Sequence, residues 1–234
     1  MTGTVNVHDA DGIRTLQLEA GERNLLNPQN MALLHAALVE ADADTAVHGI
    51  LLTAAGDVFC GGLDIPAIRA GANPVEFASA VAGLYRLLPR LTKPVAAAVQ
   101  GDALAGGAGL VAAVDYAVTV PSARIGSQEV ANGIWPMVAQ VPLVHRIGVR
   151  NALENIGCGE PFTAQRALEV GLVQAVVEPD ELVERATRWL VQARRGAAAY
   201  ASGRPFLYEL AQLDYDTALD TAFERFASMF TEPS

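Results

Sequence analysis

The sequence GDALAGGAGL, residues 101–110, lies between a predicted buried strand at residues 94–100 and a predicted apolar helix at residues 108–114. Its four glycines and three alanines allow the backbone to come close to a ligand. Amides at the N-terminus of a helix are unpaired and lie at the positive end of the helix dipole, so they can stabilise a negative oxygen. The same residues would also suit a tightly packed turn, and this stretch alone leaves both interpretations open.

A second glycine-rich stretch, VFCGGLDI at residues 58–65, follows a predicted buried strand at residues 48–54 and enters a short helix that Asp64 is placed to cap. Two such elements, each after a buried strand, could direct their amides at one carbonyl oxygen. That arrangement is an oxyanion hole. Neither stretch has the spacing of a dinucleotide-binding GxGxxG motif or the Gly-Lys-Ser/Thr of a P-loop, which disfavours a nucleotide cradle.

The rest of the chain alternates strand and helix patterns, which predicts an α/β fold. Residues 4–20 alternate apolar and polar side chains around DADG, as a β-hairpin does, and residues 28–43 have apolar side chains at helical spacing. We expect a core at residues 1–178 and a helical C-terminal region at residues 179–234. The C-terminal region carries an apolar stripe suited to a subunit interface: Leu210, Leu213, Ala218, Ala222, Phe223, Phe226 and Met229.

Composition favours small-molecule chemistry in the cytoplasm. The 234 residues are 51% hydrophobic and 18% charged, as in a folded protein with a buried core. A net charge of -10 disfavours nucleic-acid binding, which needs a basic face. The chain has no apolar run long enough to span a membrane, and it begins without the pattern of a signal peptide. We expect Cys60 and Cys158 to be reduced thiols, and the histidines are too scattered for a metal site.

In this order, the two glycine-rich stretches resemble motifs of the crotonase (enoyl-CoA hydratase/isomerase) superfamily. Residues 59–65 are similar to the pattern F-x-A-G-x-D-[IL], and residues 101–107 are similar to G-x-A-x-G-G-G, with Ala105 as a conservative departure. The resemblance runs from about Val5 to Val177 and includes LTKPVAAAVQG and ALEVGLVQAVVEPDEL as further landmarks.

The resemblance implies a crotonase-like ββα superhelix (spiral) at residues 1–178, which would hold the acyl-CoA site. The C-terminal region at residues 179–234 would then serve oligomerisation and cover CoA, in a homotrimer or a dimer of trimers. It implies an acyl-CoA thioester substrate, with no metal and no cofactor beyond the coenzyme A of that substrate. Carried over position by position, it assigns the oxyanion N–H groups to Leu63 and Gly106. The ERNLLN segment resembles the family stretch that lines CoA, so Arg23, Leu25 and Leu26 become candidate CoA contacts. The other substrate-binding candidates are Gly61, Asp64, Ile65, Gly107 and Trp135.

The acidic residues indicate which of the superfamily's reactions the sequence favours. Hydratases of this superfamily place two carboxylates around the double bond, and this sequence has Gly109 at the first position and Glu129 at the second. Other branches carry an aspartate where this chain has Met137. A lone carboxylate suits a 1,3 proton shift, in which Glu129 removes a C2 proton from a 3-enoyl-CoA and returns it at C4. IGSQEVANGI, around Glu129, also resembles the single-glutamate enoyl-CoA isomerases, so we predict an isomerase with Glu129, Leu63 and Gly106 as catalytic residues.

Several alternatives stay open. Without the resemblance, Glu129 would be an ordinary solvated or salt-bridged acid. With ordered water it could support hydration, thioester hydrolysis, decarboxylation or carbon–carbon cleavage. A non-catalytic acyl-CoA-binding homologue and a purely structural subunit are the non-enzyme alternatives. Trp135 suits either the acyl pocket or the core, and we expect Cys60 to be a packed thiol because no patterned histidine accompanies it.

Overall fold

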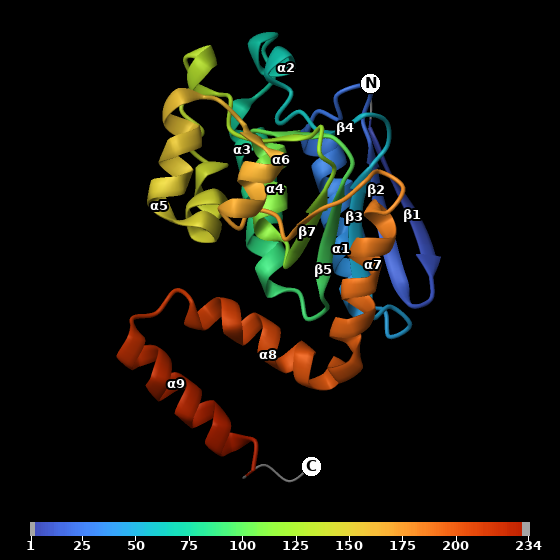
Figure 1. The fold of residues 1–234 in the computed structure, drawn as a ribbon, viewed down its shortest axis with the longest axis vertical. Helices are drawn as coiled ribbons and strands as arrows, with labels where there is room; N and C mark the ends of the chain where they lie inside the picture. Colours follow the sequence, from blue (N-terminus) through green and yellow to red (C-terminus); the bar gives the residue numbers. More distant parts are fainter. Residues whose placement is uncertain (1–2, 231–234) are drawn as a thin grey trace.

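The computed structural model describes residues 3–230 and opens with the expected β-hairpin (Figure 1). Strand β1 (Thr4–Ala10) pairs antiparallel with β2 (Ile13–Glu19). The turn between them has a positive φ at both central residues, 51° at Asp11 and 76° at Gly12. A two-residue turn in which both residues have a positive φ twists in the same sense as the flanking strands. The pair Asp-Gly adopts this conformation readily. The hairpin prediction is confirmed.

The main sheet has six strands in the order β1-β2-β3-β5-β7-β10. The inner strands after the hairpin are β3 (Gly49–Ala54), β5 (Val95–Val99) and β7 (Tyr116–Thr119), and the short β10 (Ala175–Val176) forms the edge. Every pair beyond the hairpin is parallel. β5 is buried along its whole length because both faces of the sheet are covered, which explains its unbroken apolar sequence.

Alternate residues of β3 pack on opposite faces of the main sheet. Ile50 and Leu52 join the core cluster that contains α1 (Pro28–Ala43). Leu51 joins the cluster that contains α7 (Leu182–Ala193). This alternation follows from the two-residue period of a strand. One helix on each face therefore buries the sheet, and α1 has the bounds that the sequence predicts.

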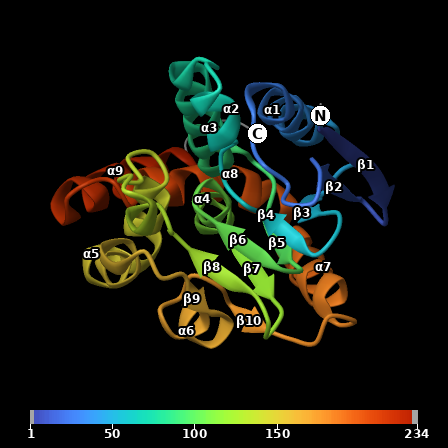
Figure 2. The ribbon, with the colours of Figure 1, turned by 90° about the horizontal axis from the view of Figure 1, so that it is seen from above.

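A second sheet of four short strands lies beside the first, in the order β4-β6-β8-β9 (Figure 2). Strands β4 (Val58–Cys60), β6 (Asp102–Leu104) and β8 (Arg124–Gly126) pair in parallel, and β9 (Phe162–Thr163) closes the sheet antiparallel. The sequence did not predict these strands, and it assigned β4 and β6 to glycine-bearing loops and turns. Strands of two or three residues are too short to show an apolar period.

The chain winds as a spiral in which two strands precede each helical segment. β3 leads to β4, β5 to β6 and β7 to β8, so each pass adds one strand to each sheet. This is the expected ββα superhelix. The helices after these passes and after β9 are α2 (Ile65–Arg69), α3 (Pro74–Leu87), α4 (Gly106–Ala113), α5 (Gln140–Cys158) and α6 (Ala164–Glu169). Short 3-10 turns lie at Leu88–Arg90, Val130–Asn132 and Arg194–Gly196.

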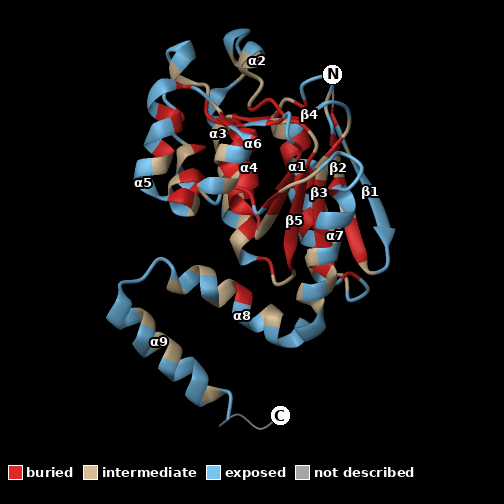
Figure 3. Cartoon of the chain, in the orientation of Figure 1, coloured by how far each residue is buried: buried red, intermediate tan, exposed pale blue. Residues whose placement is uncertain are grey.

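The C-terminal helices differ in burial (Figure 3). α7 packs against β3, β5 and β7 and so belongs to the core, although it follows the expected boundary at residue 178. α8 (Ala197–Leu210) and α9 (Tyr215–Ser228) extend away from the sheets, and α9 has no buried residue (Figure 1). The segment that leaves the core therefore begins at α8. Phe223 and Met229 of the predicted stripe are exposed. Within residues 3–230, no helix is long and apolar enough to cross a membrane.

Candidate active site

Three segments that the sequence singled out follow three neighbouring strands of the second sheet. Residues 61–63 follow β4, residues 105–107 follow β6, and residues 127–129 follow β8. Because these strands are parallel, their carboxyl ends lie at the same edge of the sheet. The topology therefore brings both glycine-rich turns and the segment of Glu129 to one place, although they are far apart in the sequence.

The two glycine-rich turns touch each other. Gly62 has a φ of 92°, and a Cβ built on it would lie 2.7 Å from the Cβ of Ala105 and 3.4 Å from the nitrogen of Gly106. Glycine is needed here, both for this φ and for room against the facing turn. The Gly106 nitrogen therefore lies beside the peptide that carries the Leu63 N–H, as an oxyanion hole requires.

The N–H groups of Leu63 and Gly106 have no acceptor in the part of the chain that the structure describes. Leu63 forms an isolated parallel bridge with Leu26, in which the Leu26 N–H donates to the Gly62 carbonyl at 2.8 Å and the Asp64 N–H donates to the Leu26 carbonyl at 2.9 Å. Bonding directions alternate along extended backbone, so the Leu63 N–H points away from this bridge. Gly106 is the first residue of α4, where an N–H has no intrahelical partner.

Backbone hydrogen bonds of the second sheet connect the loop that carries Glu129 to the second glycine-rich turn. The Ala105 N–H donates to the Gly126 carbonyl at 2.9 Å, which extends the β6–β8 pairing toward the site. Glu129 is half-buried, and its Oε2 accepts hydrogen bonds from the Ser127 hydroxyl at 2.5 Å and the Gln128 N–H at 3.1 Å. Its Oε1 has no donor among residues 3–230. One carboxylate oxygen is thus held while the other can accept a proton.

A buried asparagine on α5 fixes the loop that carries Glu129. The Asn155 side chain accepts a hydrogen bond from the Ser127 N–H at 2.7 Å and donates to the carbonyls of Ser127 and Glu160, each at 2.8 Å. A Cβ on Gly126 would lie 2.7 Å from Asn155 Oδ1, so this close approach requires glycine. The sequence analysis missed both Ser127 and Asn155. Proximity to Glu129 was a signal for Ser127, whereas no local pattern marks Asn155.

The structure also adds a tyrosine that the sequence did not single out. Tyr85 comes from α3, and its hydroxyl donates a hydrogen bond to the Gly106 carbonyl at 2.8 Å. Desolvation of this hydroxyl raises the pKa of Tyr85 well above its ordinary value, and the charges of Cys60, as a thiolate, and Glu129 act in the same direction. The phenol is therefore neutral and lies near Glu129. Its place depends on how α3 packs against α4, which a local sequence pattern cannot reveal.

The segment expected to contact CoA lies against the first glycine-rich turn. The Arg23 carbonyl accepts a hydrogen bond from the Gly61 N–H at 2.8 Å, and a Cβ on Gly61 would lie 3.1 Å from Cδ2 of Leu25. Arg23 is exposed and Leu25 is half-buried. Leu26, however, is completely buried, and its Cδ1 would lie 3.4 Å from a Cβ on Gly106. Leu26 therefore supports the oxyanion turn rather than offering surface to a ligand.

Two further candidates have structural roles at the turns. A Cβ on Gly107 would lie 2.4 Å from the carbonyl oxygen of Cys60, so glycine allows α4 to pack against β4. The Asp64 side chain accepts a hydrogen bond from the Ala67 N–H at 3.0 Å and caps α2, as predicted. Ile65, the first residue of α2, is half-buried at the rim of this turn.

Trp135 lies on the loop that follows Glu129, and it is not a core residue. It is 43% exposed, and its indole N–H donates to the Gln140 side chain at 2.9 Å. The same loop is joined to Glu129 by a hydrogen bond from the Ile134 N–H to the Glu129 carbonyl at 3.0 Å. Trp135, Ile134 and Met137 together form an exposed apolar segment beside the catalytic candidate.

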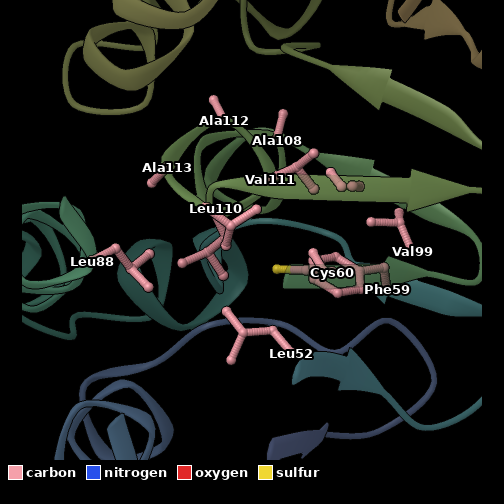
Figure 4. Close-up of a cluster of buried hydrophobic side chains, with 14 of the residues drawn as sticks. Leu52, Phe59, Cys60, Leu88, Val99, Ala108, Leu110, Val111, Ala112 and Ala113 are labelled. Atoms are coloured by element: carbon pink, nitrogen blue, oxygen red, sulfur yellow. The ribbon is translucent and has the colours of Figure 1, made fainter. Parts of the chain in front are cut away.

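Cys60 is completely buried among apolar side chains of β4 and α4 (Figure 4). Burial raises the pKa of its thiol to about 12, so it is protonated at neutral pH. This agrees with a packed thiol and disfavours a nucleophile. Among the described residues, no cluster of histidine, cysteine, aspartate and glutamate could hold a metal ion. A surface cavity of about 570 Å³ beside His48 and Arg194 includes none of the candidate site residues.

Comparison with known proteins agrees with this geometry. The family model described as enoyl-CoA hydratase/isomerase matches residues 9–233. An enoyl-CoA hydratase of Mycobacterium smegmatis is 28% identical, with a TM-score of 0.90 over 98% of this chain and 92% of that chain. An enoyl-CoA hydratase of Bacillus anthracis is 29% identical, with a TM-score of 0.86 over 96% of this chain and 90% of that one. An enoyl-CoA hydratase/isomerase family protein of Silicibacter pomeroyi is 28% identical, with a TM-score of 0.90 over 98% and 100%. This chain belongs to the enoyl-CoA hydratase/isomerase family of the crotonase superfamily.

Proposed function

We propose that this protein isomerises 3-enoyl-CoA to 2-enoyl-CoA, with Glu129 as its acid–base residue. The proposal is supported by one observation: the segments of Glu129 and of the unpaired Leu63 and Gly106 amides follow neighbouring parallel strands at one edge of the second sheet. The position at which a hydratase would carry its other acid is Gly109. A single carboxylate can move a proton between two carbons, whereas addition of water usually employs two acids.

In the proposed reaction, the N–H groups of Leu63 and Gly106 donate hydrogen bonds to the thioester oxygen of the substrate. Glu129 accepts the C2 proton, and the electron pair of the broken C–H bond delocalises over the dienolate and its oxygen. Each amide donor stabilises the negatively charged transition state by about 3 kcal/mol. Glu129 then returns the proton at C4, which leaves the double bond between C2 and C3. Because Ser127 holds Oε2, Oε1 can serve both carbons in turn.

Substrate binding is proposed to use the surfaces around the first glycine-rich turn. The exposed guanidinium of Arg23 suits the phosphates of CoA, because its planar donors match phosphate oxygens. Leu25 and Ile65 offer half-buried apolar surface next to this turn, and Trp135 offers exposed aromatic surface beside Glu129. No metal or further cofactor is needed, since the thioester acidifies the C2 proton and the amides stabilise the enolate.

We also propose that the chain forms a homotrimer or a dimer of trimers and acts in cytoplasmic fatty acid metabolism. The exposed apolar side chains of Phe223 and Phe226 on α9, and of Met229 directly after it, offer a surface that a second copy could cover. The free thiols of Cys60 and Cys158 suit a reducing compartment. Light scattering after size-exclusion chromatography tests the assembly, and a monomer at working concentration would contradict it.

The function is tested by incubating the protein with 3-enoyl-CoA, 2-enoyl-CoA and a saturated acyl-CoA in deuterated water. Mass spectrometry then locates the incorporated deuterium. We expect isomerisation of 3-enoyl-CoA with exchange at C2 and C4. Glu129→Gln keeps the size of the side chain but removes the base, so turnover should fall by about 100-fold or more. The exposed Glu178→Gln is the matched control and should keep wild-type turnover. Absence of both isomerisation and deuterium exchange would overturn the proposal.

Hydration is the second candidate function. Two of the similar structures, from Mycobacterium smegmatis and Bacillus anthracis, are of proteins named enoyl-CoA hydratases. If this chain shared that activity, 2-enoyl-CoA would gain water at C3 faster than 3-enoyl-CoA isomerised. The same incubation distinguishes the two, since hydration adds the mass of water and isomerisation does not.

A further inference from the structure

We propose that Tyr85 determines the reaction specificity of this site by filling the space that a second catalytic acid would occupy. This inference rests on the proposed function, because it assigns a cause to the single-carboxylate chemistry. Tyr85 is not proposed to exchange protons with the substrate. Its role is to decide which groups can reach the reacting atoms.

The first step of the argument is steric. Gly109 lies on α4 and is buried. A Cβ built on it would lie 2.2 Å from the Tyr85 hydroxyl oxygen, 2.5 Å from Cζ and 3.1 Å from Cε1. These separations are far inside van der Waals contact, and the atoms opposed to the Cβ belong to a rigid ring. A side chain at position 109 therefore cannot coexist with Tyr85 in its present place.

The second step is that Tyr85 is held in this place. Its hydroxyl donates to the carbonyl of Gly106, the residue whose own N–H is assigned to the oxyanion hole. On the same helix, Phe77, Val81 and Leu84 are buried and anchor α3 to the core. Moving the phenol away from Gly109 would break the hydrogen bond and leave the Gly106 carbonyl without this donor.

The third step concerns chemistry. Hydration forms a bond from a water oxygen to C3, transfers one water proton to a carboxylate and delivers a proton to C2. Tyr85 does not replace the missing acid, because its hydroxyl proton is engaged by the Gly106 carbonyl and its raised pKa keeps it protonated. The phenol ring also keeps water from the space above Gly109. Glu129 remains as the group that can move a proton.

The test is to place a glutamate at position 109 in two backgrounds, one that keeps the Tyr85 ring and one that lacks it. Tyr85→Ala combined with Gly109→Glu removes the ring and adds a carboxylate. We expect its hydration of 2-enoyl-CoA to exceed that of wild type by about 100-fold, the lower end of the range for a positioned acid. Gly109→Glu alone should not gain hydration. Tyr85→Phe combined with Gly109→Glu is the matched control, because Cζ still blocks the Cβ at 2.5 Å, and it should not gain hydration either.

Thermal unfolding of Gly109→Ala in two backgrounds tests the steric step separately. The added methyl should lower the melting temperature in the wild-type background. In the Tyr85→Ala background it should lower the melting temperature much less. Equal losses in both backgrounds would overturn the proposal, whether or not the glutamate variants fold. It would also fail if Gly109→Glu alone hydrated as fast as the double variant, or if a folded double variant isomerised without hydrating. Wild-type protein that isomerises nothing and exchanges no deuterium would instead count against the proposed function.

Discussion

The hydroxyl of Ser127 donates a hydrogen bond of 2.5 Å to Oε2 of Glu129, and it is completely buried while doing so. This bond holds one oxygen of the carboxylate that we propose as the acid–base group. A hydrogen bond to a charged group is worth about 1.5–3 kcal/mol, and about 1.4 kcal/mol corresponds to a factor of ten. Ser127→Ala should therefore lower the kcat of isomerisation by about 10-fold and leave KM nearly unchanged, as measured by steady-state kinetics.

The control for this prediction is Ser202→Ala, which removes an exposed hydroxyl on α8 that bonds to the backbone of its own helix. It should leave kcat unchanged. An unchanged kcat in Ser127→Ala would mean that the Gln128 N–H alone is enough to orient Glu129.

Ala105 carries backbone strain at the oxyanion turn. Its φ of 53° and ψ of -116° lie in a region that glycine adopts readily and alanine does not. Strain of this kind costs about 1–3 kcal/mol, whereas glycine loses about 0.4–1 kcal/mol more backbone entropy on folding. Ala105→Gly should therefore stabilise the protein by about 1 kcal/mol in chemical denaturation at fixed protein concentration.

Ala108→Gly is the matched control because it makes the same exchange in the interior of α4, where the backbone is helical. It should destabilise the protein by about 1 kcal/mol, the usual cost of glycine in a helix. The strain interpretation would fail if both variants changed stability in the same direction.

Much of the fold could be predicted from the sequence because its signals are local. The hairpin depends on Asp11 and Gly12, and α1 on Pro28 and the apolar spacing behind it. The second sheet could not be predicted in the same way. Its strands are held by pairing between distant segments, such as Ala103 with Ile125, and each is too short to carry a pattern of its own.

The candidate site shows the same difference between local signals and long-range packing. The close approach of the two glycine-rich turns could be predicted because glycine is favoured where two backbone segments come into contact, as at Gly62. Glu129 was found through the family resemblance. Tyr85 and Asn155 reach the site from α3 and α5, whose places are set by tertiary packing. The side chain of Leu26, a predicted CoA contact, is completely buried, and sequence similarity does not show which way a side chain points.

The two cysteines should differ sharply in reactivity. Cys60 is completely buried with its thiol pKa raised to about 12, whereas Cys158 is exposed. Thiolate is the reactive form, so iodoacetamide at neutral pH should modify Cys158 and spare Cys60 in the native protein. Peptide mass spectrometry should find both modified after denaturation. Native labelling of Cys60 as fast as Cys158 would contradict the protonated, packed thiol.

The same shift predicts how stability depends on alkaline pH. The native state keeps the Cys60 proton up to about pH 12, whereas the unfolded thiol releases it near its ordinary pKa of 9.0. The native state binds more protons within this window, so the stability from Cys60 is complete below pH 9 and is lost as pH rises. The slope should be about 1.4 kcal/mol per pH unit steeper in wild type than in Cys60→Ala. Equal slopes would contradict it.

Arg204 should be the main anchor of α8. Its buried guanidinium donates to Asp115 at 2.8 Å, to the carbonyl of Leu88 at 2.8 Å and to the carbonyl of Leu91. Arg204→Met would keep the length of the stem but leave the Asp115 charge and two carbonyls without this donor. Removing one partner of a buried pair costs about 3–5 kcal/mol.

That cost can be separated from the general effect of losing an arginine. Arg188 forms an exposed ion pair with Glu184 on α7. In chemical denaturation of both variants, Arg188→Met should therefore lower the free energy of unfolding by less than about 1 kcal/mol. Limited proteolysis should cut Arg204→Met first within α8 and α9, because these helices bury little else against the core. If cleavage instead began in the core while α8 stayed protected, the C-terminal helices would have to be held by contacts other than Arg204, and the exposed apolar face of α9 would be the first place to look for them.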